Sequence, residues 1–396
     1  MFKAIIHGCL LFHCSVDVDN FGRKRKWFHN RRVKAFSSPV WLLCSGKHPT
    51  TERRRVLVTG AAGFIGFHVA KSLSQLGDFV VGIDNFNDYY DRNLKRLRAQ
   101  VLLHQFGISL QDLDITDQEA LEHLIREYQF THILHLAAQA GVQYSLVNPL
   151  SYTSSNVQGF VSLLEALKNS CLSMNLDFPV IVYASSSSVY GKNKKVPFSE
   201  SDSVTMPANI YAVTKISNEL VAQVYHNLYG FKLTGLRYFT VYGAWGRPDM
   251  SYYLFAEAIY EQRELFLYQT EQPVLSIYPG TVMEPCRDFT HITDIIKGTI
   301  AALYKGYDCE VINLGNCYPQ RISYMVQCLE ELLGKKAIIR YRPLPMGDVP
   351  CTYADISKAK NLLDFEPQVN LEQGLKDFSE WFIRWKEWKV DHASAI

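Results

Sequence analysis

The 396-residue sequence contains no Cys-x-x-Cys pair, no His-Glu-x-x-His motif and no apolar run of about 20 residues, the length that a membrane-spanning helix needs. Its nine cysteines are odd in number and scattered, which favours a reducing compartment over a disulfide framework. The two histidines of "HILH", His132 and His135, lie in an apolar run of strand character. We therefore expect a cytoplasmic protein without a metal site and without a membrane-spanning segment.

A strong charge of one sign is also lacking, because the net charge is only +2. Residues 1–55 hold 12 Lys/Arg against 3 Asp/Glu, and the remainder holds 29 against 36. The acidic body argues against nucleic acid as a partner. Residues 1–50 are expected to form a disordered basic leader. Its stretch "GRKRKWFHNRRVK" is interpreted as a solvated arm, with contact to an anionic surface as the alternative.

A glycine-rich stretch lies between a strand pattern and a helix pattern. Residues 56–58 are apolar like a buried strand, and apolar residues recur at helical spacing from residue 65 to residue 73. The glycines between them are Gly60, Gly63 and Gly66. Such glycines allow a tight turn and a close approach to a pyrophosphate, which then faces the helix N-terminus. This context predicts a dinucleotide-binding loop.

An acidic residue ends the next strand pattern. Asp84 closes "FVVGID" and stands 18 residues after Gly66, where a carboxylate can accept hydrogen bonds from the adenosine ribose hydroxyls. A carboxylate there repels a 2′-phosphate, and Asn85, Phe86 and Asn87 supply no arginine to accommodate one. The sequence therefore predicts NAD, and not NADP, as the cofactor.

Strand and helix patterns continue to alternate along the chain, which predicts an α/β fold with a doubly wound parallel sheet. Ligands of such sheets lie beyond the carboxyl ends of the strands. The expected strands are 109–116, 132–138, 180–185 and 233–239, and the expected helices lie near 94–101, 156–167 and 211–229.

Two motifs carry candidate chemistry. "YAVTK" places Tyr211 and Lys215 on one face of a helix, where the ammonium is expected to lower the phenol pKa and make Tyr211 a general base. "YASSSSVYG", residues 183–191, puts four serines at a strand end. The first of them, Ser185, is expected to serve the turn.

Taken in this order, the glycine fingerprint, the serine-bearing strand end and Tyr-x-x-x-Lys resemble the extended short-chain dehydrogenase/reductase family, over about Arg55 to Trp388. The resemblance implies a Rossmann domain in which Tyr211 accepts a proton, Lys215 also holds the nicotinamide ribose and Ser186 polarises the substrate oxygen. The residues expected to contact the cofactor are Gly60, Ala62, Gly63, Phe64, Ile65, Gly66, Asp84, Asn85, Asp114, Ile115, Ala137, Ala138, Asn156, Tyr211, Lys215 and Tyr238.

The resemblance also separates activities within the family. Sugar dehydratases carry an Asp-Glu pair after the catalytic serine or threonine, and UDP-glucuronate decarboxylases usually carry a glutamate in that stretch. Here those positions are Ser187 and Ser188. With no acid at the strand end, the chemistry is expected to stop at reversible hydride transfer, which indicates an epimerase.

Six further motifs resemble the UDP-glucuronate 4-epimerases of that family. UDP-glucose 4-epimerases have asparagine where this chain has Thr240. The implied mechanism passes through a 4-keto sugar that rotates before the hydride returns, and Ser187, Ser188 and Thr240 are placed to hold the C6 carboxylate out of alignment for decarboxylation. The motifs are "FNDYYD", "AAQAGVQYSLVNP", "RYFTVYGAWGRPDM", "RDFTHITDI", "NLGN" and "GDVPCTYAD".

The second half of the chain is expected to bind the nucleotide end of the UDP-sugar. Arg247 and Arg287 are candidates for the diphosphate, and Asp348 for the uridine ribose. The expected domains are an NAD-binding domain over 55–239, with a return of 288–315, and a smaller C-terminal α/β domain over 240–287 and 316–390. The closing "WFIRWKEW" is interpreted as a packed terminal helix, and the family resemblance implies a homodimer.

Three positions depart from the epimerase pattern: Gln143 replaces an arginine, Ala244 a proline and His291 a tyrosine. Gln143 weakens the preference for glucuronate over a neutral sugar. The alternatives are therefore a UDP-glucose/galactose or N-acetylhexosamine 4-epimerase, a simple dehydrogenase, and a non-catalytic NAD-binding protein on the same fold.

Overall fold

The computed structural model describes residues 15–18, 24–27, 53–270 and 284–391, in two compact units that divide after Thr51. In the first unit, β1 (Ser15–Val18) and β2 (Lys24–Trp27) pair antiparallel. Apart from these eight residues, the expected leader over residues 1–50 lies outside the described residues, and its disorder stays a prediction.

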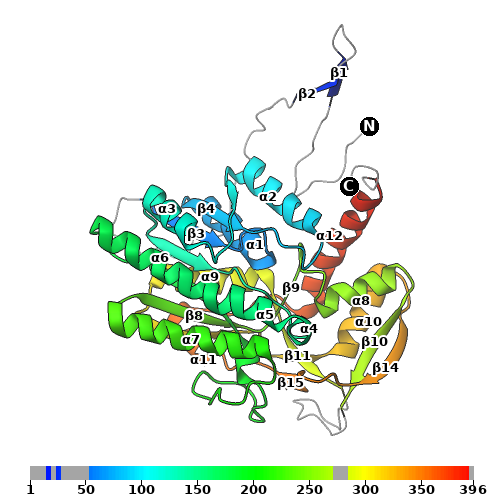
Figure 1. Ribbon diagram of the computed structural model, residues 1–396. Coiled ribbons are helices and arrows are strands. Elements are labelled where there is room, and N and C mark those ends of the chain that lie inside the picture. Colours follow the sequence, from blue (N-terminus) through cyan, green and yellow to red (C-terminus); the bar gives the residue numbers. More distant parts are fainter. Residues whose placement is uncertain (1–14, 19–23, 28–52, 271–283, 392–396) are drawn as a thin grey trace. The chain divides into compact units, whose positions relative to one another are not determined.

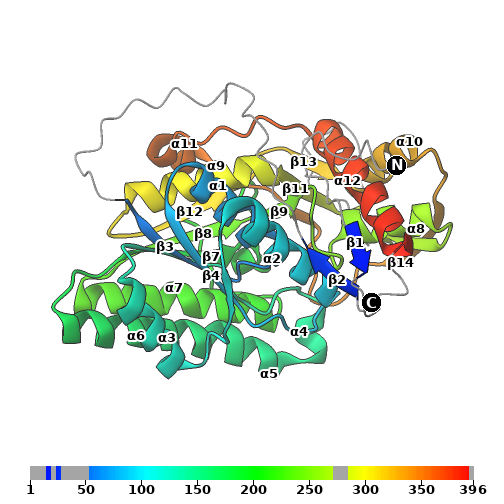
Figure 2. The same ribbon diagram turned by 90° about the horizontal axis from the view of Figure 1, so that it is seen from above.

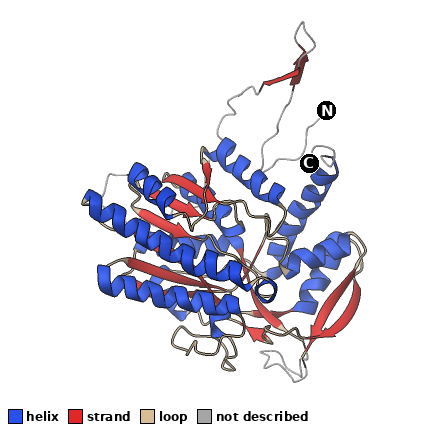
Figure 3. Cartoon of the chain, viewed as in Figure 1, coloured by secondary structure: helices blue, strands red, loops and turns tan. Residues whose placement is uncertain are grey.

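Parallel strands form the central sheet of the second unit, in the order β12-β8-β7-β6-β3-β4-β5 (Figure 1, Figure 3). Val56, Leu57 and Val58 in β3 are fully buried. A strand covered on both faces is apolar on both sides, which explains this continuous run. The bounds are β3 (Arg55–Thr59), β4 (Phe79–Asp84), β5 (Leu110–Asp112), β6 (His132–His135), β7 (Val180–Ser186), β8 (Lys232–Tyr238) and β12 (Cys309–Leu314).

Helices cover both faces of this sheet (Figure 2). One face carries α1 (Phe64–Gln75), α2 (Arg92–Phe106), α9 (Ile292–Lys305) and α11 (Ser357–Leu363). The opposite face carries α3 (Gln118–Tyr128), α6 (Gly159–Met174) and α7 (Ile210–Tyr229). Short helices precede α6 and follow β7: α4 (Tyr144–Val147), α5 (Pro149–Tyr152), the π-helix η1 (Thr153–Gln158) and the 3₁₀ helix η2 (Ser187–Tyr190).

Each face of the central sheet packs with its helices into a hydrophobic core. The C-terminal part adds a third core, in which Tyr252, Phe378 and Trp385 are buried. Its helices are α8 (Ser251–Tyr260), α10 (Ile322–Leu333) and α12 (Leu371–Asp391). Its strands are β9 (Thr240–Tyr242), β11 (Cys286–His291), β13 (Pro319–Arg321) and β15 (Cys351–Thr352) in one sheet, and β10 (Glu264–Gln269) paired with β14 (Ile338–Pro343).

The predicted α/β class with a parallel sheet is confirmed. Helix α9 packs on α1, and β12 joins the sheet beside β8, so residues 288–315 reach the central sheet by way of these two elements. The boundary between a cofactor domain and a sugar domain lies inside one compact unit and stays a prediction. Among the described residues, no helix is both long and apolar enough to cross a membrane.

Candidate active site

One cavity of about 360 Å³ runs along the carboxyl ends of the central strands. The glycine-rich loop lies in its wall, together with the serines that end β7, the start of α7 and residues of β9, β11 and the loop before β15. The cavity thus collects motifs that are far apart in the sequence, as expected for ligand sites of doubly wound sheets.

The glycine-rich loop turns tightly between β3 and α1. Gly60 has a φ of +69°, and a Cβ there would lie 2.8 Å from the backbone nitrogen of Ala137. The Gly63 N–H donates to the Gly60 oxygen at 2.9 Å, and α1 begins at Phe64. The first residues of α1, Phe64 to Gly66, line the cavity, which is where the motif predicts a phosphate group.

Asp84 is held at the end of β4 by two backbone donors. Its carboxylate accepts from the Ala62 N–H at 3.1 Å and from the Phe86 N–H at 2.9 Å. Burial raises its pKa above the ordinary value, while the nearby Lys95 ammonium and these N–H groups oppose the shift. Asp84 lines the cavity, so its remaining lone pairs can accept from ribose hydroxyls.

Three of the predicted cofactor residues do not line the cavity among the described residues, and each lies behind the wall instead. Ala62 donates its N–H to Asp84. Asp114 accepts from the Asn85 side chain at 2.7 Å. Asn156 is fully buried and accepts from the Gln139 N–H at 2.7 Å. The other predicted cofactor residues are part of the wall.

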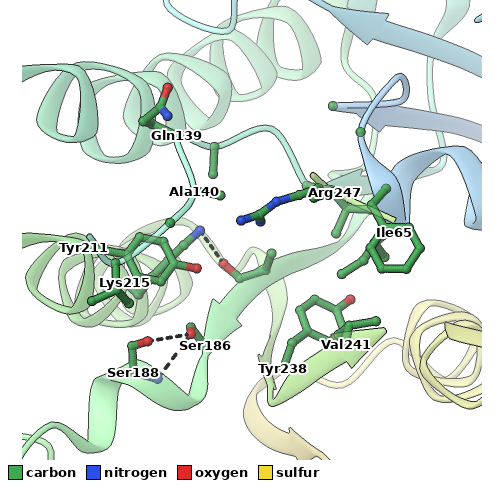
Figure 4. A pocket seen from close by; sticks show the side chains of 18 of the residues that line it. Ile65, Gln139, Ala140, Ser186, Ser188, Tyr211, Lys215, Tyr238, Val241 and Arg247 are labelled. Carbon is green, nitrogen blue, oxygen red and sulfur yellow. Dashed lines mark hydrogen bonds between the residues drawn. The ribbon is translucent and has the colours of Figure 1, made fainter. Parts of the chain in front are cut away.

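Tyr211 and Lys215 lie on the first turns of α7 and face the cavity (Figure 4). The Lys215 Nζ donates to the Ala184 oxygen at 2.8 Å and lies 5.8 Å from the centre of the Tyr211 ring. Burial lowers the pKa of Lys215 to about 8. Burial also raises the pKa of Tyr211, and the groups that oppose this shift are Ser186 and Arg247. In this structure, the lysine therefore does not produce the expected lowering of the phenol pKa.

The four serines have different roles. Ser185 is the penultimate residue of β7, and its hydroxyl donates to the Glu219 carboxylate at 2.6 Å, so its expected turn role was wrong. Ser186 donates to the Ser188 hydroxyl at 3.2 Å and accepts the Ser188 N–H at 3.1 Å (Figure 4). Ser186, Ser187 and Ser188 all line the cavity near Tyr211.

The predicted substrate residues also border the cavity, and both arginines are paired. Arg247 forms two hydrogen bonds with Asp249, at 2.9 and 2.6 Å. Arg287 donates to Asp348 at 2.7 Å. The residue predicted to bind the diphosphate therefore lies beside the residue predicted to bind the uridine ribose. Thr240, the first residue of β9, borders the cavity too.

Sequence reasoning missed Lys95 on α2. Its side chain is buried, donates to Asn87 at 2.7 Å and lines the cavity close to Asp84. A signal was available, because Lys95 and Arg98 lie at helical spacing beside the apolar Leu94 and Leu102. Arg98 is fully buried and bonds to the Ala62 oxygen at 2.9 Å, so the inner face of α2 supports the glycine-rich loop.

The departures from the epimerase pattern lie in different environments. Gln143 is exposed, and it is not among the described residues that line the cavity. The Ala244 oxygen bonds to the His68 ring at 2.9 Å. His291 is buried against Tyr242, with ring centres 5.3 Å apart. Of these three positions, Gln143 bears most on the choice between an acidic and a neutral sugar. An arginine at this exposed position would have to reach the cavity from the protein surface.

A family model described as GDP-mannose 4,6 dehydratase matches residues 57–378. The chain belongs to this family. The match covers the cavity and its supporting elements, and the family falls within the extended short-chain dehydrogenases/reductases that the motifs predicted. The family name refers to a dehydratase, but this member has Ser187 and Ser188 where such enzymes carry an Asp-Glu pair.

Similar proteins are named for epimerisation and not for dehydration. UDP-glucuronate 4-epimerase 4 of Arabidopsis thaliana is 45% identical over 371 residues, covering 89% of this chain and 82% of the relative. A solved UDP-glucuronic acid 4-epimerase from Bacillus cereus, in complex with UDP-glucuronic acid and NAD, has a TM-score of 0.73 and 33% identity, covering 84% of this chain and 99% of that one.

A UDP-glucose 4-epimerase from Thermotoga maritima, solved with UDP-glucose, is also similar. Its TM-score is 0.71 at 30% identity, and the match covers 84% of this chain and 99% of that chain. The fold is therefore shared with one enzyme named for an acidic sugar, UDP-glucuronic acid, and one named for a neutral sugar, UDP-glucose.

Proposed function

We propose that the chain is an NAD-dependent UDP-sugar 4-epimerase that interconverts UDP-glucuronate and UDP-galacturonate. The observation that carries this proposal is a cavity lined by Tyr211, Lys215 and Ser186 in which, among the described lining residues, no carboxylate lies beside Ser186, Ser187 and Ser188 in the sequence. Among the described residues lining it, the carboxylates are Asp84 and Asp348, at the expected ribose positions. The names of the Arabidopsis thaliana and Bacillus cereus proteins support the same activity.

The cofactor site fits NAD. The glycine turn and the start of α1 line the cavity and suit a pyrophosphate, and the Asp84 carboxylate suits an unphosphorylated adenosine ribose. Lys95 brings a cation close to Asp84, where it could favour the 2′-phosphate of NADP. Asn87 already accepts a hydrogen bond from Lys95 at 2.7 Å, however, and Asp84 stays in the wall to repel a 2′-phosphate. Bound NAD supplies a hydride acceptor that later returns the hydride to the sugar.

The proton is handled by Tyr211. Tyr211 lines the cavity and burial raises its pKa, so the phenolate form needs a positive charge beside it, which the nicotinamide ring of bound NAD would supply. In that form the phenolate oxygen can take the proton of the C4 hydroxyl as hydride leaves C4. Ser186 lies against the phenol and can donate to the same oxygen of the sugar. Lys215 is fixed by the Ala184 oxygen, so its remaining N–H donors are oriented toward the cofactor ribose.

The serines favour epimerisation over elimination. Water loss from the 4-keto sugar needs an acid and a base beside C5 and C6, and Ser187 and Ser188 supply only hydroxyl groups. The Ser186 hydroxyl donates to Ser188 in this structure and would turn its single proton to the C4 oxygen of a bound sugar, while the Ser188 hydroxyl keeps its own proton to donate to the C6 carboxylate. Thr240 lines the same cavity, and these hydroxyls are proposed to keep the carboxylate from aligning for decarboxylation.

A specific observation favours the neutral-sugar alternative. The Arg247 guanidinium points toward Tyr211 (Figure 4), but Asp249 neutralises it, so it adds little net positive charge for a sugar carboxylate. A panel of UDP-glucuronate, UDP-glucose and the UDP-N-acetylhexosamines decides, with kcat/KM measured for each. The proposal expects the highest value for UDP-glucuronate, and activity confined to neutral sugars would overturn its substrate assignment.

The proposed location is the cytoplasm, and the proposed assembly is a homodimer. Helix α7 exposes Val213, Leu220, Val224 and Leu228 at helical spacing, and Leu150 lies near the start of this stripe. Such a continuous apolar stripe is a common association surface. Light scattering on the purified protein is expected to give twice the mass of the chain, and a Leu220→Glu, Val224→Glu variant is expected to give the single mass.

A further inference from the structure

Arg247 lines the cavity, and two of its guanidinium nitrogens already donate hydrogen bonds to Asp249. Its Nε donates to Asp249 Oδ1 at 2.9 Å and its Nη2 to Asp249 Oδ2 at 2.6 Å, a bidentate pair that fixes the plane of the guanidinium. Each side chain is about a quarter exposed, at 23% and 24%. The remaining N–H groups, on Nη1 and on the far side of Nη2, are left to bind a ligand.

Asp249 is held in turn by Tyr89. The Tyr89 hydroxyl donates to Asp249 Oδ2 at 3.0 Å. The Tyr89 ring packs against Tyr144, with ring centres 4.9 Å apart. Gly141 makes room for this hydroxyl, because a Cβ there would lie 2.1 Å from it. Tyr89 therefore has a fitted site, and its hydroxyl points at the carboxylate that orients Arg247.

The segment that carries Tyr89 begins at the ribose acid. Asp84 accepts from the Phe86 N–H at 2.9 Å, Asn85 from the Asn87 N–H at 3.1 Å, and Asn87 from the Tyr89 N–H at 3.4 Å. These successive side chain to backbone turns give the loop a defined path. One short segment thus contributes to the cofactor end and to the substrate end of the cavity.

We propose that Tyr89 and Asp249 are positioning residues that hold the Arg247 guanidinium in the orientation that binds the diphosphate of the UDP-sugar. The proposal rests on the proposed function for the identity of that ligand. Without the Tyr89 hydroxyl, Asp249 keeps one partner and the pair gains freedom, so part of the binding free energy is spent on ordering Arg247. The effect falls on substrate binding and leaves the proton transfer at Tyr211 in place.

The test compares Tyr89→Phe and Asp249→Asn with wild type, all as purified with their bound cofactor. UDP is the probe for binding by calorimetry, and UDP-glucuronate is the substrate for kcat and KM. Tyr144→Phe is the matched control, because it removes a neighbouring hydroxyl from the same ring cluster without touching Asp249. Thermal unfolding of each variant checks its folding.

Tyr89→Phe is expected to raise the Kd for UDP and the KM by about three- to tenfold, with kcat changed less than about twofold. Asp249→Asn is expected to raise both by about threefold or more, because the lost orientation of Arg247 outweighs the gain in net positive charge, and Tyr144→Phe to change neither by more than about twofold. Equal UDP affinity in wild type, Tyr89→Phe and Asp249→Asn would overturn this inference alone. A fall in kcat at constant KM in these variants would indicate a merely structural role and would also overturn it. Failure of the wild type to bind UDP would overturn the proposed function itself.

Discussion

Replacing Lys215 by methionine is expected to stabilise the protein while it removes the activity. Lys215 is 2% exposed, and burial lowers its pKa from 10.5 to about 8. One pKa unit corresponds to about 1.4 kcal/mol, so the buried charge costs about 3 kcal/mol at pH 7. The hydrogen bond to the Ala184 oxygen, 2.8 Å long, offsets about 1 kcal/mol. The net gain for Lys215→Met is therefore about 2 kcal/mol at pH 7.

The sign of the pH dependence follows from the lowered pKa of Lys215. Below pH 8 the lysine is protonated in the folded and the unfolded state, and the folded state carries the full cost. Between pH 8 and 10.5 the folded lysine is neutral while the unfolded one is still protonated, so the wild type becomes relatively more stable as the pH rises. The advantage of Lys215→Met is expected to disappear near pH 10.

Urea unfolding of both proteins, freed of bound nucleotide and measured from pH 7 to pH 10, gives the two free energies of unfolding. Epimerase activity of the variant is expected to fall by about 10²-fold or more, because the cofactor ribose loses its cation. A variant that is no more stable than wild type at pH 7 would show that burial of the Lys215 charge does not lower the stability of the fold. So would an advantage that stays constant up to pH 10.

Three further changes test other parts of the site. Tyr211→Phe is expected to lower kcat by about 10²- to 10⁴-fold while the Kd for UDP stays within about twofold, and substantial remaining turnover would exclude Tyr211 as the base. Thr240→Val combined with Ser188→Ala is expected to release carbon dioxide and a UDP-pentose, seen by mass spectrometry; unchanged products would contradict the role of these hydroxyls. Asp84→Asn is expected to weaken NAD binding by about 10- to 100-fold, measured as the cofactor retained after gel filtration, and full retention would contradict the ribose contact.

The parallel sheet could be predicted because its strands are buried on both faces and therefore read as apolar runs. The boundaries were less accurate where side chains compete with the backbone. The strand expected over 109–116 ends at Asp112, since Asp114 accepts the Thr116 N–H at 2.9 Å and forms a turn. The closing aromatic segment was correctly interpreted as a packed helix, because Trp385 is buried in α12.

In the candidate site, motifs with fixed spacing were predictable and contacts between distant loops were not. The fingerprint glycines, Tyr211 and Lys215 line the cavity as expected. Arg287 pairs with Asp348, 61 positions further along the chain, and helix or strand periodicity in the sequence does not predict a contact at that distance. The direction of the Tyr211 pKa shift was also missed, because burial depends on the packing of several elements around the phenol.

Epimerisation at C4 is tested most directly by incubation of the protein with UDP-glucuronate in D₂O, followed by proton NMR of the sugar. We expect conversion to the galacturonate configuration with a full proton signal at C4, because the hydride is taken and returned without exchange with solvent. Recovery of UDP-glucuronate alone would exclude this activity. Product carrying deuterium at C4 would exclude hydride return from the cofactor.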